Sequence, residues 1–158
     1  MPPPLLFDVD PADLERVVLT REQIYELLPQ RYEFMLLGGV CMVDKGQRRL
    51  VAFADVGAGD WWVRGHIPGR PLLPGALMME MAGQTSGIAA KLMTDSRGFM
   101  GFGGLDKCKF REAVAPPARI HILCEGTDFR PRRVVSRTQG LVDGRLVFEA
   151  TVTGLIIS

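Results

Sequence analysis

One segment, residues 75–93, limits the folds open to this chain more than any other feature. Its sequence, GALMMEMAGQTSGIAAKLM, directly follows Pro74 and is long enough for about five helical turns. Apolar residues lie all round such a helix, so it has no polar face wide enough for the protein surface. They are Leu77, Met78, Met79, Met81, Ala82, Ile88, Ala89, Ala90, Leu92 and Met93. We therefore expect the rest of the chain to enclose this helix.

Six stretches have the composition and partial alternation of β-strands. The tripeptides KGQ and VDG supply turns between two pairs of them. With one enclosed helix, the simplest arrangement is an α+β fold in which a curved antiparallel sheet of about six strands wraps around the helix. Such a sheet keeps edge strands, which favours dimerisation through an edge. The stretches are residues 34–44, 48–56, 98–111, 118–129, 133–142 and 145–157.

Two short helices are expected before the first strand. Asp10 and Pro11 are typical of a helix start, which predicts a helix over PADLERVV, residues 11–18. Thr20 and Gln23 match a capping box at the start of REQIYELL, and Pro29 ends that second helix.

Length and composition indicate one globular domain. The chain has 158 residues, of which 47% are hydrophobic and 23% charged. No apolar run reaches the roughly 18 residues of a membrane span, and the N-terminal residues do not resemble a secretory signal. The three cysteines are widely spaced and form no CxxC pair. This pattern argues against a disulfide framework or a zinc site and favours the cytoplasm.

The net charge of +1 is unevenly distributed. Residues 1–60 contain ten acidic and six basic residues, whereas residues 105–140 contain eight basic and four acidic ones. This excess is too small, and too poor in aromatic residues, to indicate nucleic-acid binding. Two interpretations stay open: an ordinary exposed strand pair, or a docking surface for an acidic partner.

The segment before the long helix contains the first candidate for chemistry. His66 lies among Gly65, Pro68, Gly69, Pro71 and Pro74, and prolines restrict the backbone to few conformations. A rigid backbone suits a catalytic site, but it also suits a tight loop that enters a helix. The prolines alone do not distinguish the two.

Glu80 and Gly75 are the second and third candidates. A carboxylate in an enclosed helix must find a partner or stay protonated, and Gln84, one turn further, is the nearest candidate partner. The N–H groups near Gly75 begin the helix and lack helical acceptors, so they suit an oxygen that becomes negative. Together with His66 these residues suit removal of a proton beside a carbonyl and loss of a group one carbon further on.

The stretch GHIPGRPLLPGALMMEMAGQ resembles the motif G-H-F-P-G-x-P-x-x-P-G, followed by E-x-x-x-Q, of the 3-hydroxyacyl-[acyl carrier protein] dehydratases. LLPQRYEFMLLGGV and GGLDKCKFREAVAPP resemble two further segments of that family, in the same order. The resemblance implies the hotdog fold for residues 20–158 as a single domain. Residues 1–19 are then an N-terminal extension. The family's usual residues are replaced at Gln30, Gly38 and Gly39.

The resemblance also implies roles for individual residues. His66 would take the C2 proton, Glu80 would help the C3 hydroxyl to leave, and the Gly75 N–H would polarise the thioester carbonyl. Pro74 and Gln84 would contact the substrate, and no cofactor or metal would be needed. Glu80, where isomerising members have Asp, favours the branch that only dehydrates.

The family's substrates are carried by acyl carrier protein, so the resemblance implies that partner. Lys109, Arg130, Arg132 and Arg133 are the candidate docking residues. The resemblance further implies a homodimer in which His66 of one subunit faces Glu80 of the other, and it leaves a trimer of dimers open. Two other functions remain: a hotdog thioesterase, with Glu80 directing water, and a non-catalytic acyl-binding subunit.

Overall fold

The computed structural model describes residues 1 and 3–157. Its core is a single antiparallel sheet with the strand order β1-β2-β3-β5-β6-β7-β4. Six strands are close to those expected, and a two-residue strand is added at one edge. The strands are β1 (Leu19–Thr20), β2 (Gly39–Asp44), β3 (Arg49–Val56), β4 (Phe99–Phe110), β5 (Ala118–Phe129), β6 (Arg133–Val142) and β7 (Arg145–Ile157).

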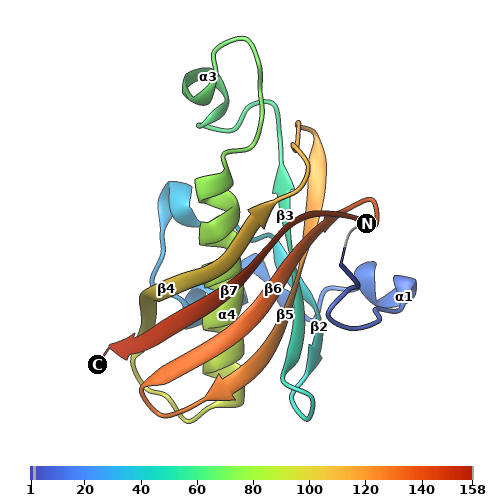
Figure 1. Ribbon diagram of the computed structural model, residues 1–158. Helices are drawn as coiled ribbons and strands as arrows, with labels where there is room; N and C mark the ends of the chain where they lie inside the picture. Colours follow the sequence, from blue (N-terminus) through green and yellow to red (C-terminus); the bar gives the residue numbers. More distant parts are fainter. Residues whose placement is uncertain (2, 158) are drawn as a thin grey trace.

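The long helix α4 (Gly75–Met93) has the bounds expected from the sequence and lies in the hollow of the curved sheet (Figure 1). Its residues from Leu77 to Ala90 are buried, with the exception of Glu80. The enclosed helix is therefore confirmed, but one narrow face is open, because Ala76 is exposed and Glu80 is only partly buried. The ring of Phe102 lies against Gly83, where a Cβ would collide with it.

The shorter helices are α1 (Pro11–Leu14), α2 (Arg21–Leu27), the 3₁₀ helix η1 (Tyr32–Phe34) and α3 (Val63–His66). The capping box at Thr20 and Gln23 is present as predicted. The prediction of a helix over residues 11–18 was too long. The N–H of Val18 instead donates to the carbonyl of Val40 at 2.7 Å, because the chain there joins the sheet. β-Branched residues such as Val17 and Val18 favour that extended conformation.

The N-terminal segment packs on the outer face of the sheet, opposite α4 (Figure 1). Phe7 is buried there against an apolar cluster that includes Val51, Phe53 and Leu123. The segment is also tied to β6, because the Leu6 N–H donates to Oε1 of Gln139 at 2.8 Å. Phe7, together with Leu6, Val9 and Leu14, therefore covers an apolar surface that would otherwise meet solvent. The division into an extension and a domain that begins at residue 20 stays a prediction.

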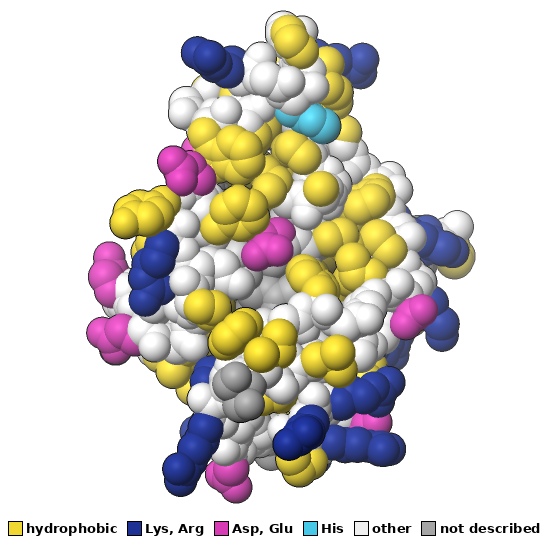
Figure 2. Space-filling view, turned by 90° about the vertical axis from the view of Figure 1, so that its left-hand side faces the viewer, with side chains coloured by type: hydrophobic (Ala, Val, Ile, Leu, Met, Phe, Trp, Pro, Cys, Tyr) yellow, Lys and Arg dark blue, Asp and Glu magenta, His cyan; other side chains and the backbone are white. Residues whose placement is uncertain are grey.

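The strand β4 forms the other edge of the sheet. Four of its large apolar side chains are between 42% and 52% exposed, an unusual amount for a monomer surface. They are Phe99, Phe102, Leu105 and Phe110. Figure 2 looks onto this side of the molecule and shows hydrophobic side chains gathered around an acidic group. Over the described residues, no helix is long and apolar enough to cross a membrane.

Candidate active site

His66 ends the short helix α3, which lies on a loop that projects beyond the sheet and the start of α4 (Figure 1). Its backbone N–H donates to the carbonyl of Trp62 at 3.0 Å. Trp62 is only 5% exposed, so it anchors the base of this loop in the core. The His66 side chain itself is exposed. The backbone of His66 is therefore held by a buried anchor, while its side chain is open to solvent.

Glu80 lies in the second turn of α4, on the helix face that the sheet leaves open. The sequence suggested a fully enclosed carboxyl that either finds a partner or stays protonated. The structure provides the partner: Nε2 of Gln84 donates to Oε1 of Glu80 at 2.9 Å. Residues four apart on a helix share a face, so this pair was foreseeable. The partial exposure of Glu80 corrects the expectation of complete burial.

Gln84 connects Glu80 to the interior. Its side chain is only 2% exposed, and its Nε2 also donates to the carbonyl of Phe34 at 2.8 Å. Its Oε1 accepts a hydrogen bond from the hydroxyl of Tyr25 at 2.6 Å. Sequence reasoning did not identify Tyr25. The one signal that could have pointed to it is that a tyrosine hydroxyl usually needs a hydrogen-bond partner when it is buried.

Pro74 and Gly75 form the start of α4. Pro74 is the N-cap, and its carbonyl accepts from the N–H groups of Leu77 and Met78 at 3.0 and 3.2 Å. Within the described residues, the Gly75 N–H has no hydrogen-bond acceptor, as expected for a first helical residue. A Cβ at Gly75 would lie 2.8 Å from Cζ of Phe110. The glycine therefore makes room for the Phe110 ring of the same chain.

The structure does not join the two proposed catalytic side chains within one subunit. Among the described residues, no hydrogen bond or ion pair connects His66 with Glu80. Pro74, Gly75, Glu80 and Gln84 lie together on the first half of α4, whereas His66 lies on the projecting loop. One chain thus presents two separate parts of the predicted site.

The four candidate docking residues do not form one patch. Lys109 in β4 pairs with Glu149 of β7, whereas Arg133 in β6 pairs with Leu155 of β7. Their partners in β7 are six positions apart, which is about 20 Å along a strand. Arg130 and Arg133 both form ion pairs with Asp128, at 3.1 and 3.2 Å. Arg132 is exposed and has no ion-pair partner among the described residues.

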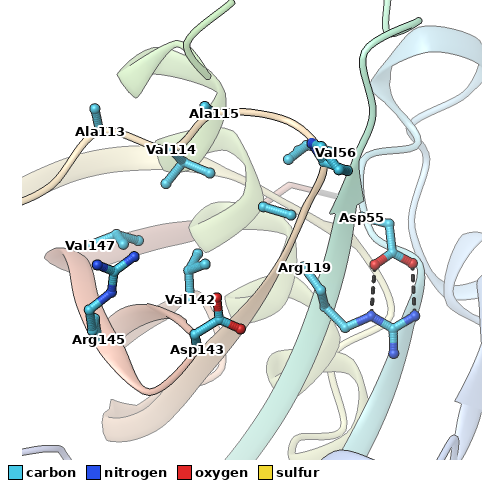
Figure 3. Close-up of a pocket in the computed structure, with 12 residues that line it drawn as sticks. Asp55, Val56, Ala113, Val114, Ala115, Arg119, Val142, Asp143, Arg145 and Val147 are labelled. Carbon is cyan, nitrogen blue, oxygen red and sulfur yellow. Dashed lines mark hydrogen bonds and ion pairs between the residues drawn. The ribbon is translucent and has the colours of Figure 1, made fainter.

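Two pockets are relevant to the predicted site. One, with a volume of about 340 Å³, borders α4 at Met81, beside Glu80, and is lined by Asp60, Trp61 and Tyr32. The larger pocket, of about 660 Å³, lies by the turn between β6 and β7 (Figure 3). Asp55 and Arg119 form a two-point ion pair at its rim, with distances of 2.9 and 2.7 Å. None of the predicted catalytic or substrate-binding residues lines this larger pocket.

A sheet curved around one central helix defines a hotdog-fold protein, and comparison with known proteins agrees. The family model of the FabA-like domain matches residues 28–151. The solved dehydratase heterocomplex ApeI:P of Xenorhabdus doucetiae has a TM-score of 0.72 at 15% identity, over 85% of this chain and 91% of that chain. That likeness concerns the fold.

Two curated relatives are more similar in sequence. The 3-hydroxyacyl-[acyl-carrier-protein] dehydratase FabZ of Listeria monocytogenes is 35% identical over 136 residues, which are 85% of this chain and 94% of that protein. The FabZ of Bacillus subtilis is 32% identical over 139 residues, or 86% of this chain and 96% of that protein. The chain therefore belongs to the FabA-like family of hotdog-fold proteins, and the resemblance inferred from its motifs is confirmed.

Proposed function

We propose that this protein dehydrates (3R)-3-hydroxyacyl-[acyl carrier protein] to the trans-2-enoyl form, in fatty acid biosynthesis or a related lipid or polyketide pathway. The observation that carries this proposal is the similarity to dehydratases of that name over 85% of the chain, at 35% identity. The retained His66, Gly75 and Glu80 supply a base, an amide donor and an acid for the reaction.

In the proposed reaction, a nitrogen of the His66 imidazole takes the proton from C2 of the acyl chain. The electron pair of that C–H bond forms the C2–C3 double bond, and the C3–O bond breaks. The hydroxyl leaves as water with a proton supplied through Glu80. The N–H of Gly75 donates to the thioester oxygen as it gains negative charge, and Gln84 holds the Glu80 carboxyl in place.

We further propose that the site is completed in a homodimer. The open edge strand β4 exposes apolar side chains, and Glu80 lies on the open face of the neighbouring helix. A second copy across this edge would cover the apolar face in Figure 2. It would bring His66 of the partner subunit toward Glu80. Within one chain, no hydrogen bond or ion pair between described residues joins His66 to Glu80.

Acyl carrier protein is the proposed carrier of the substrate. Arg132 and Lys109 are the stronger docking candidates, because both are exposed and neither forms an ion pair with a carboxylate among the described residues. Arg130 and Arg133 share Asp128, and Lys109 is a separate contact. We also propose a cytoplasmic location, where the free thiols of Cys41, Cys108 and Cys124 would stay reduced.

The test uses trans-2-enoyl-[acyl carrier protein] substrates of graded chain length with the purified protein. Hydration removes the conjugated double bond, so the enoyl absorbance falls, and the length series locates the preferred acyl chain. We expect this fall without release of free thiol. Thiol release would instead identify a thioesterase, and binding of the carrier with unchanged absorbance would identify a non-catalytic acyl-binding protein.

A further inference from the structure

A buried chain of hydrogen bonds leads from the helix α2 to the carboxyl of Glu80. The N–H of Leu37 donates to the Tyr25 hydroxyl at 2.9 Å, and that hydroxyl donates to Oε1 of Gln84 at 2.6 Å. Nε2 of Gln84 then donates to Glu80 at 2.9 Å. Tyr25 and Gln84 are 3% and 2% exposed, so this chain is shielded from competing water.

The orientation of the Gln84 amide decides whether it helps or opposes the Glu80 carboxylate. In the observed orientation its two N–H hydrogens face the Phe34 carbonyl and Glu80, which are both acceptors. After a flip, its oxygen would face those two acceptors without a hydrogen between them. Such a flipped amide would leave two partly buried acceptors unpaired, which is costly.

Tyr25 is the group that selects the observed orientation. Its oxygen already accepts the Leu37 N–H, so its single hydrogen is directed to Gln84 and requires an oxygen there. Burial raises the pKa of Tyr25 to about 12. The hydroxyl therefore keeps its proton, and its function as a donor, throughout the neutral pH range.

We propose that Tyr25 is a positioning residue, which orients the Gln84 amide so that it holds one oxygen of the Glu80 carboxyl. The second oxygen of Glu80 accepts no hydrogen bond from the described residues and is left for the substrate. This inference rests on the proposed function. It adds a residue from outside the region that carries the catalytic motif, because Tyr25 lies in α2, 55 positions before Glu80.

The first test is the variant Tyr25→Phe, which keeps the ring and removes the hydroxyl. We expect kcat for hydration of a trans-2-enoyl thioester to fall about tenfold to hundredfold, the scale of one hydrogen bond to a charged group, with KM within about twofold of wild type. The matched control is Thr138→Val in β6. It removes another buried hydroxyl, which donates to the Ala150 carbonyl at 2.8 Å. Thr138→Val should keep kcat.

A double-mutant cycle separates positioning from a structural role. If Tyr25 acts through Gln84, Tyr25→Phe should have no further effect on kcat once Gln84→Leu is present. If Tyr25→Phe lowers kcat by the same factor in the wild-type protein and in the Gln84→Leu variant, the proposal is overturned. A change confined to KM, or an unchanged kcat, would do the same.

The wild-type protein offers a readout that needs neither a variant nor turnover. NMR should show the Tyr25 hydroxyl proton in slow exchange with water and both Gln84 side-chain amide protons protected from exchange. A rapidly exchanging hydroxyl or unprotected Gln84 amide protons would overturn the proposal even if Tyr25→Phe failed to fold. If wild type shows this signature but does not hydrate enoyl thioesters, the proposed function is wrong and the hydrogen-bond chain stands.

Discussion

The two halves of the proposed site differ in how the chain holds them. Glu80 is held by Gln84, whose amide is fixed by Phe34 and Tyr25 in the interior. His66 is exposed at the end of a four-residue helix on a projecting loop. The carboxyl is thus held within one chain, whereas the His66 side chain forms no hydrogen bond or ion pair with any residue that the structure describes.

This difference is the reason for proposing that a second copy of the chain completes the site. A catalytic group acts well only when its geometry is fixed before the reaction. The chain fixes the Glu80 carboxyl by itself. It leaves the imidazole of His66 exposed on the projecting loop, and in the proposed dimer a partner subunit would hold it.

The largest expected effect is the loss of kcat when either proposed catalytic side chain, His66 or Glu80, is removed. Despite their different surroundings, His66→Ala and Glu80→Gln should each lower kcat for enoyl hydration about 10²- to 10⁴-fold, the range for general acid–base groups. Steady-state kinetics at saturating substrate measures this. Near-normal kcat in either variant would remove that residue from the site.

A charge at the edge strand β4 should dissociate the proposed dimer, and so part His66 from the Glu80 of the other subunit, without altering either residue. Leu105 in β4 is 42% exposed, and Leu105→Lys would place an ammonium group in the proposed subunit interface at a large desolvation cost. We expect monomers in sedimentation velocity and activity at least about tenfold lower, falling further on dilution. A monomeric but fully active variant would show that one chain completes the site alone.

The free energy of unfolding should depend on the surroundings of Glu80 but hardly on His66. Gln84→Leu would leave the Tyr25 hydroxyl and the Phe34 carbonyl without their partner, which should lower the free energy of unfolding by about 1–3 kcal/mol. His66→Ala removes an exposed side chain and should change it by less than about 0.5 kcal/mol. Urea unfolding measures both. A larger loss for His66→Ala would mean that its loop is packed more firmly than the structure shows.

The smallest effect concerns the other histidine, which lies on the outer face of the sheet. Burial lowers the pKa of His121, and nearby Arg119 adds to this, while Asp55 and Glu15 oppose it. The unfolded state therefore binds a proton more readily. Stability should decline as pH falls below about 6.5, the unfolded value. Thermal unfolding between pH 8 and 5.5 should show a shallower decline for His121→Gln, and an equal decline would contradict this assignment.

Much of the fold followed from local sequence signals. The bounds of α4 were predictable because Pro74 marks its start and its apolar residues require enclosure. The turn between β6 and β7 was predictable because Asp143 and Gly144 both adopt positive φ, of 49° and 76°, which suits an Asp-Gly hairpin.

The features that the sequence did not reveal depend on contacts between distant segments. Residues 34–38 were assigned to a strand, but β2 begins at Gly39. The Phe34 carbonyl and the Leu37 N–H bond instead with the side chains of Gln84 and Tyr25. Similarly, the distance between Lys109 and Arg133 follows from strand register, which their positions in the sequence do not show.

The most direct test mixes the inactive variants His66→Ala and Glu80→Ala under conditions in which subunits exchange. If each site takes its imidazole and its carboxyl from different subunits, a mixed dimer contains one intact site. An equal mixture should then regain about a quarter of the wild-type rate, because half of the dimers are mixed and each has one working site of two. A mixture that exchanges subunits and stays as inactive as its components would contradict the shared site.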